Sequence, residues 1–109
     1  MPELPDRPRL ENFQNYVREL EAERGFSSQS VRDKCLLMGE EMGELFKAVR
    51  KREGLATDPE SSVGELSGEL TDIFIYLCAI ANRYGIALEE AFLEKERINK
   101  QRIWKDLSS

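Results

Sequence analysis

The sequence contains no histidine and only two cysteines among its 109 residues. The absence of histidine excludes Ser-His-Asp and Cys-His catalysis, His-ligated zinc sites and the Glu-x-x-His di-iron bundles. Cys35 and Cys78 form no C-x-x-C motif, so the sequence indicates neither a zinc site nor a disulfide framework. We expect two buried free thiols in a reducing cytoplasm.

Long apolar runs and an excess of basic charge are also missing. No stretch approaches the roughly 20 apolar residues of a membrane span, and the first residues lack the apolar region of a signal peptide. The formal net charge is −5, from 16 basic and 21 acidic residues. A chain with this charge is a poor partner for a nucleic acid polymer or an anionic membrane. We therefore expect a cytoplasmic protein that binds neither.

Four segments place apolar residues at intervals of three and four, the spacing of an amphipathic helix. We expect helices over about 10–24, from the serines of 27–30 to Arg52, from Ser62 to about Tyr84, and over about 88–104. No segment alternates with period two, so the expected fold is all-α and four-helix-bundle-like. The expected organisation is a flexible arm (1–9), one domain (10–105) and a short tail (106–109).

Two of these helices carry carboxylates beside their apolar stripes. Glu41 and Glu44 share one edge of the second helix, with Glu40 one step further round, and Glu69 and Asp72 share one edge of the third. If the two helices pack antiparallel, these acids converge and repel one another unless a cation neutralises them. A hard divalent ion such as Mg²⁺ suits such oxygen ligands. The alternative is a solvated surface, because Glu-x-x-Glu is common on exposed helices.

The fourth expected helix presents Lys95, Asn99 and Arg102 at positions i, i+4 and i+7, which form one face. Two cations and an amide on one face suit a polyphosphate, because Lys and Arg pair with phosphoryl oxygens. The alternative is a salt-bridged face in contact with solvent, since charged residues also surround these three positions.

The third helix also predicts a second subunit. Its main apolar stripe is centred on Leu66, Ile73 and Leu77, whereas Ile75 and Cys78 lie away from that stripe. Apolar residues on an outer face indicate a partner surface. We expect a homo-oligomer, either a homodimer or a homotetramer.

Three motifs occur in order: residues 39–45 (GEEMGEL), residues 69–77 (ELTDIFIYL) and the K-x-x-x-N-x-x-R pattern of residues 95–102. Together they resemble the all-α NTP pyrophosphatases of the MazG and dCTPase type, over about residues 10–105. The resemblance implies an oligomeric helical bundle that hydrolyses a nucleoside triphosphate to the monophosphate and pyrophosphate. It also implies Mg²⁺ as cofactor, with Mn²⁺ able to substitute, and a role in cleaning the dNTP pool.

The resemblance assigns roles residue by residue. It implies that the metal ligands are Glu41, Glu44, Glu69 and Asp72. Glu40 would add a ligand or orient the attacking water. The phosphates or sugar would be contacted by Lys95, Asn99 and Arg102, and Tyr76 would line the cavity. Glu40 and Glu41 are thus the implied catalytic acids. A carboxylate can serve as general base, so the missing histidine is no obstacle.

Phe26 stands where dCTPase-like members place an aromatic residue against the base. The alternative is that Phe26 is a hydrophobic staple before the second helix. Those members also carry a tryptophan late in the second helix. Residues 49–52 here contain no aromatic residue, so the sequence does not identify the preferred base.

Two other functions compete with this one. A phosphoribosyl-ATP pyrophosphatase would use the same chemistry on a single metabolite. A non-enzymatic helical interaction module would use the carboxylates only for solubility.

Overall fold

The computed structural model describes residues 2–55 and 63–108, with side chains up to Arg102. This part of the chain contains four helices and no strand: α1 (Leu10–Arg24), α2 (Val31–Arg52), α3 (Leu66–Arg83) and α4 (Leu88–Ser108). The expected all-α class is confirmed. None of these described helices combines the length and apolar character that crossing a membrane requires.

Local capping chemistry places the helix ends. Ser30 precedes α2, and its hydroxyl accepts a hydrogen bond from the Asp33 amide at 3.1 Å. The Asp33 carboxylate accepts one in return from the Ser30 amide at 3.0 Å, which completes a capping box. Gly25 ends α1 with φ 76°, and Gly85 follows α3 with φ 66°, both in the left-handed region that favours glycine. The sequence predicted these three ends.

Two helix ends differ from the prediction. The third helix begins at Leu66, with Glu65 as its N-cap, and residues 63–65 are not helical. Ser62, the expected N-cap, lies outside the described residues, as does most of the expected loop over 54–61. The fourth helix continues to Ser108, beyond the expected end near Trp104.

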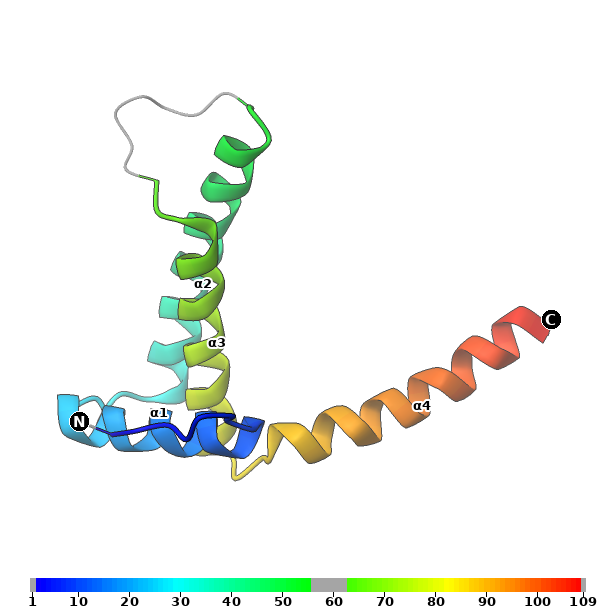
Figure 1. The fold of residues 1–109 in the computed structure, drawn as a ribbon, viewed down its shortest axis with the longest axis horizontal. Coiled ribbons are helices and arrows are strands. Elements are labelled where there is room, and N and C mark those ends of the chain that lie inside the picture. Colours follow the sequence, from blue (N-terminus) through cyan, green and yellow to red (C-terminus); the bar gives the residue numbers. More distant parts are fainter. Residues whose placement is uncertain (1, 56–62, 109) are drawn as a thin grey trace.

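The helices do not form one closed bundle within the chain. Helices α2 and α3 lie side by side and antiparallel, α1 crosses one end of this pair, and α4 projects away from it (Figure 1). The radius of gyration is 17.4 Å. A compact chain of this length would have a radius of gyration of about 13 Å. The excess reflects a fourth helix whose main contact within the chain is with α1.

A small core joins α1 to α3. Val17, Cys78 and Ala79 are buried together, and the Phe13 and Phe74 rings meet edge to face against them, with centroids 5.6 Å apart. Burial raises the pKa of the Cys78 thiol to about 11.

The prediction for the outer face of α3 is wrong. Cys78 is 0% exposed and Ile75 packs against the core, whereas Leu70 and Leu77 are 53% and 45% exposed. Apolar residues occur on most sides of α3, so periodicity could not show which side meets α1. The side that meets α1 carries the small residues Cys78 and Ala79, which are buried against Val17.

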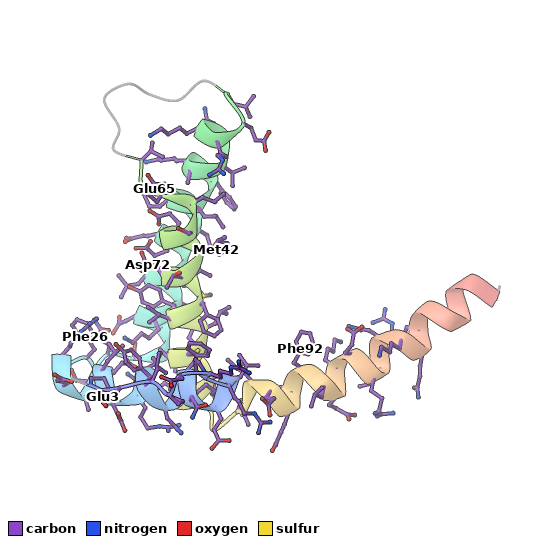
Figure 2. The ribbon with its side chains drawn as sticks, in the orientation of Figure 1. Glu3, Phe26, Met42, Glu65, Asp72 and Phe92 are labelled. Atoms are coloured by element: carbon purple, nitrogen blue, oxygen red, sulfur yellow. The ribbon has the colours of Figure 1, made fainter. Side chains whose placement is uncertain are left out.

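The apolar stripe of α2 likewise faces outward. Phe46 is 58% exposed and Met42 is 40% exposed, while Lys34 and Ala48 are the buried residues of this helix. Cys35 is exposed, so the expectation that both thiols are buried is wrong for Cys35. On α4, Phe92 is 66% exposed and stands off the helix (Figure 2). The chain therefore leaves apolar faces uncovered on three helices.

Gln14 fixes the corner at which α4 leaves the other helices. Its side-chain amide donates to the Ile86 carbonyl at 2.8 Å and to the Asn82 side chain at 3.0 Å. Its side-chain oxygen accepts from the Leu88 amide, the first of α4, at 2.8 Å. The Asn82 side chain donates back to the Gln14 carbonyl at 2.9 Å. Gln14 is buried, so these bonds hold the start of α4 to α1.

Candidate active site

Three of the expected acids meet where α2 packs against α3. Glu41 from α2 and Glu69 and Asp72 from α3 each place a carboxylate oxygen within 4.8 Å of the others. Glu41 and Glu69 are half-buried, and Asp72 is exposed. We call these residues the acid triad. The antiparallel packing predicted from the sequence creates this group, with Asp72 on the visible side of α3 (Figure 2).

The Glu69 carboxylate is held in a confined position with one oxygen unpaired. Its Oε2 atom is buried and has no hydrogen-bond partner among the described residues. Its Oε1 atom lies where the Cβ of a side chain at Gly64 would stand, so a larger residue there would displace the end of the Glu69 side chain. A buried carboxylate oxygen without a partner is costly, and a bound cation or donor would satisfy it.

The electrostatics of the triad show an excess of negative charge. The pKa of Glu41 is raised, first by burial, then by its hydrogen bond with Glu69 and by repulsion from Asp72, Glu69 and Glu44. The pKa of Tyr76 is raised by burial and by the charges of Glu41, Asp72 and Glu40. Both shifts show that the site resists additional negative charge when no cation is bound.

The donor set fits a hard divalent cation. All three groups offer carboxylate oxygens, the ligands that Mg²⁺ and Ca²⁺ prefer. The unpaired Oε2 of Glu69 supplies a second, independent indication. Their role as ligands stays a prediction of the sequence.

Two other expected acids lie outside the triad. The Glu44 carboxylate pairs with Lys47 at 3.6 Å, and its side chain is 41% exposed. Glu40 is exposed on α2, close enough for its charge to act on Tyr76. Both residues border the site without joining the three oxygens that come together.

The expected phosphate-binding residues are not brought to the acids within this chain. Lys95, Asn99 and Arg102 lie on α4, which projects away from α2 and α3 (Figure 1). Lys95 and Arg102 are exposed, and Asn99 is half-buried.

A pocket of about 420 Å³ opens beside the acids, between α1, α2 and α3. Glu41 and Asp72 line one part of it, and the Phe26 and Tyr76 rings line another. The pocket thus contains both aromatic residues that the sequence placed at the site. Its other walls are mostly apolar: Val17, Leu20, Leu37, Ile75 and Ala79. The volume falls within the range of small-molecule sites.

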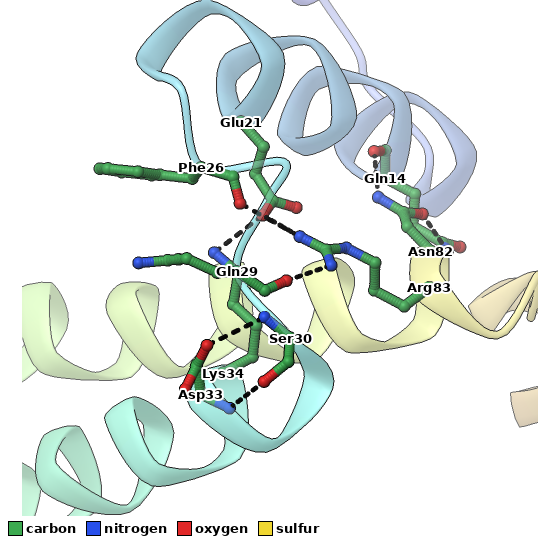
Figure 3. A network of polar contacts seen from close by, with 9 residues as sticks. All are labelled: Gln14, Glu21, Phe26, Gln29, Ser30, Asp33, Lys34, Asn82 and Arg83. Carbon is green, nitrogen blue, oxygen red and sulfur yellow. Dashed lines mark hydrogen bonds and ion pairs between the residues drawn. The ribbon is translucent and has the colours of Figure 1, made fainter.

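The pocket also holds charged residues that the sequence analysis missed. Glu21 from α1 and Lys34 from α2 line the pocket and are buried, and Arg83 from α3 joins them in one ion cluster (Figure 3). The Glu21 Oε2 atom lies 2.7 Å from the Lys34 ammonium and 3.2 Å from the Arg83 guanidinium. A signal was available, because Lys34 and Glu41 are seven residues apart, which places both on the same face of α2.

The sequence of this chain matches a known protein family. The MazG nucleotide pyrophosphohydrolase domain family matches residues 29–102. Mouse dCTP pyrophosphatase 1 is 30% identical over 100 residues, which cover 87% of this chain and 59% of the mouse protein. The chain therefore spans somewhat more than half the length of that relative.

Two crystal structures of iMazG from Vibrio DAT 722 share the fold. One superposes with a TM-score of 0.67 at 28% identity, covering 86% of this chain and 96% of the Vibrio chain. The other gives a TM-score of 0.66 at 28% identity, covering 84% and 98%. Because the family match includes both acidic motifs and more than half of the 109 residues, this chain belongs to the MazG nucleotide pyrophosphohydrolase family.

Proposed function

We propose that this protein is a Mg²⁺-dependent pyrophosphohydrolase that cleaves a nucleoside triphosphate to the monophosphate and pyrophosphate. The observation that carries this proposal is the acid triad at one end of the α1–α2–α3 pocket, with its unpaired Glu69 oxygen. Family membership supports the same reaction. Mn²⁺, with similar oxygen-ligand chemistry, is expected to substitute.

In this proposal the acidic residues have different roles. Glu41, Glu69 and Asp72 hold the cation, with Glu44 at the edge as a further ligand. A bound cation would shield the phosphate charge and activate water. Glu40 orients the attacking water and takes its proton while the anhydride bond between the α and β phosphates breaks and pyrophosphate leaves. Phe26 and Tyr76 enclose the nucleoside.

Deoxynucleoside triphosphates are the first substrates to test. The mouse relative is named for dCTP, and the Vibrio structures belong to the same family. A role in cleaning the dNTP pool follows from such an activity. The cytoplasmic location expected from the sequence stays a prediction.

The direct test is pyrophosphate release from a panel of canonical and modified NTPs and dNTPs, with Mg²⁺ and with EDTA. We expect turnover of one or a few nucleotides, lost with EDTA and in Glu41→Gln. Glu19→Gln is the matched control, because it removes the same charge from an exposed position on α1. If no nucleotide of the panel released pyrophosphate, the proposal would be contradicted. Phosphoribosyl-ATP would then be tested before a non-catalytic module is considered.

We also propose that the working enzyme is a homo-oligomer, a dimer or a tetramer. Large apolar side chains are exposed on α2, α3 and α4, including Phe46, Leu70 and Phe92. Exposed apolar faces of this kind indicate a subunit interface. A second copy could cover them and bring its α4, with Lys95, Asn99 and Arg102, to the acids of the first.

Light scattering and subunit mixing test this arrangement. We expect a mass of at least two chains. Glu41→Gln and Arg102→Ala should each be inactive alone, and mixing them should restore part of the activity if one site uses α4 of another chain. A monomeric active protein would overturn the proposed oligomer. Inactive mixtures whose exchange of subunits has been verified would overturn the site shared between chains.

A further inference from the structure

We propose that Lys34 is a specificity-determining residue that donates a hydrogen bond to a carbonyl oxygen of the nucleobase. The pocket would then favour carbonyl-bearing bases over adenine. This inference rests on the proposed function, because it assumes that the α1–α2–α3 pocket receives a nucleotide.

Lys34 is buried in the wall of the pocket that two of the acids also line. Lys34 is only 3% exposed and lines the same pocket as Glu41 and Asp72. It precedes Glu41 by seven residues on one face of α2, which separates the two Cα atoms by about 10 Å at 1.5 Å per residue. A cation at the acids would draw the phosphates to that end. The apolar and aromatic end, where Lys34 lies, is left for the base.

The ammonium group of Lys34 has donors to offer. It carries three N–H groups, and the carboxylate of Glu21 at 2.7 Å accepts one. The ammonium nitrogen also lies over the faces of the Phe26 and Tyr76 rings, 5.3 Å and 5.9 Å from their centroids. These faces attract the cation without accepting a conventional hydrogen bond. A buried donor of this kind favours a ligand that brings an acceptor.

Glu21 and Arg83 act as positioning residues for Lys34. The same Glu21 oxygen contacts both cations, so Lys34 is tied to α1 and α3 as well as to its own helix. Arg83 also donates to the carbonyl of Phe26 at 3.2 Å and to that of Gln29 (Figure 3). These bonds fix the α1–α2 connection that carries the Phe26 ring. The donor and the ring are thereby held in one arrangement before a ligand arrives.

The chemistry of the bases sets the preference. Cytosine, thymine, uracil and guanine each carry a carbonyl oxygen, whereas adenine presents ring nitrogens and an amino group. An adenine amino group in the place of the carbonyl would set donor against donor, so the remaining N–H groups of Lys34 would lack an acceptor unless the base shifted to present a ring nitrogen. Sites that hydrogen-bond a substrate group discriminate strongly against analogues that lack it.

The first experiment compares kcat/KM for dCTP, dTTP, dGTP and dATP in the wild type and in Lys34→Met. We expect the ratio of the best carbonyl-bearing substrate to dATP to fall at least tenfold, an effect on the order of that seen for hydrogen bonds to charged groups. Lys34→Arg should restore part of the ratio. Lys51→Met, the same change at the exposed end of α2, should leave it unchanged. A folded Lys34→Met variant with an unaltered ratio would overturn the inference.

A second measurement uses the unaltered protein, so it does not depend on the folding of a variant. Calorimetry compares non-hydrolysable α,β-methylene dTTP with its 2-thio and 4-thio analogues, because sulfur is a weak acceptor. We expect one thio analogue to bind about tenfold more weakly, and equal affinities for all three would refute the role of Lys34. Binding that depends on the carbonyl without turnover of any nucleotide would support Lys34 and reject the proposed hydrolysis. Turnover without carbonyl discrimination would support the proposed hydrolysis and reject the role of Lys34. The absence of both binding and turnover would reject both proposals.

Discussion

Replacing Glu41 with glutamine separates the repulsion within the acid triad from the function of the triad. The carboxylate oxygens of Glu41, Glu69 and Asp72 lie within 4.8 Å of one another. At that distance two unit charges repel by about 1 kcal/mol in water and by about 3.5 kcal/mol at an effective dielectric constant of 20. Asp72 is exposed and Glu41 only half-buried, so the lower figure applies more closely.

We therefore expect Glu41→Gln to raise the free energy of unfolding of the metal-free protein by about 1 kcal/mol. A change of that size corresponds to a rise in Tm of about 4–8 °C for a small domain. The measurement is thermal unfolding in EDTA, followed by circular dichroism. The control is Glu19→Gln, which removes one charge from exposed α1 and should change stability by less than about 0.5 kcal/mol.

Added Mg²⁺ should make the wild type more stable than Glu41→Gln, the reverse of their order in EDTA. A ligand at one hundred times its Kd stabilises the folded state by about 2.7 kcal/mol, and the wild type should gain this amount. Glu41→Gln should gain little, because one carboxylate ligand is lost. A variant that is less stable than the wild type in EDTA would contradict this expectation, as would equal stabilisation of both proteins by Mg²⁺.

Three further predictions concern the residues that support the site. In Gly64→Ala the new Cβ would overlap the Glu69 carboxylate, so Mg²⁺ titration should show about tenfold weaker binding; Gly68→Ala, with open space at its Cβ, should bind normally. Gln14→Leu leaves several buried polar groups unpaired and should lower the free energy of unfolding by about 3 kcal/mol in urea; a loss under about 1 kcal/mol would contradict this role. The raised pKa of Glu41 means that the folded metal-free protein keeps this proton to higher pH than the unfolded chain. Its stability contribution should fall as the pH rises from about the ordinary value of 4.5 through the folded pKa, and urea unfolding across this range should show that slope in the wild type but not in Glu41→Gln.

Helix positions could be predicted from the sequence because local chemistry sets them. Ser30 and Asp33 cap α2 through bonds three residues apart, and Gly25 ends α1 with a backbone angle that other residues rarely adopt. The rotation of each helix about its axis depends on its neighbours instead. Leu77 was expected inside and Cys78 outside, and the structure has the reverse, because α1 packs on the side of α3 that carries Cys78 and Ala79.

The acids of the site were visible in the sequence, whereas the charges of the pocket were not. Glu69 and Asp72 stand out because their spacing puts two carboxylates on one edge of a helix. Lys34 and Glu21 are charged, and charged residues are normally exposed. Their burial depends on each other and on Arg83, which is distant in the sequence. Helix spacing puts Lys34 on the same face of α2 as Glu41. The ion pairs that bury Lys34 follow from tertiary packing, so periodicity within a single helix could not reveal the cluster.

The exposed apolar faces connect stability to the proposed activity. The described part of the chain buries few large side chains by itself, and Phe46, Leu70 and Phe92 remain more than half exposed. Because each is still a little over half exposed, covering these side chains at a subunit interface would contribute about 1–2 kcal/mol each. If the interface also brings α4 of one chain to the acid triad of another, then folding stability and catalysis depend on the same association. Activity per chain should then fall on dilution together with the apparent Tm, whereas a site complete within one chain would keep its specific activity as the oligomer dissociates.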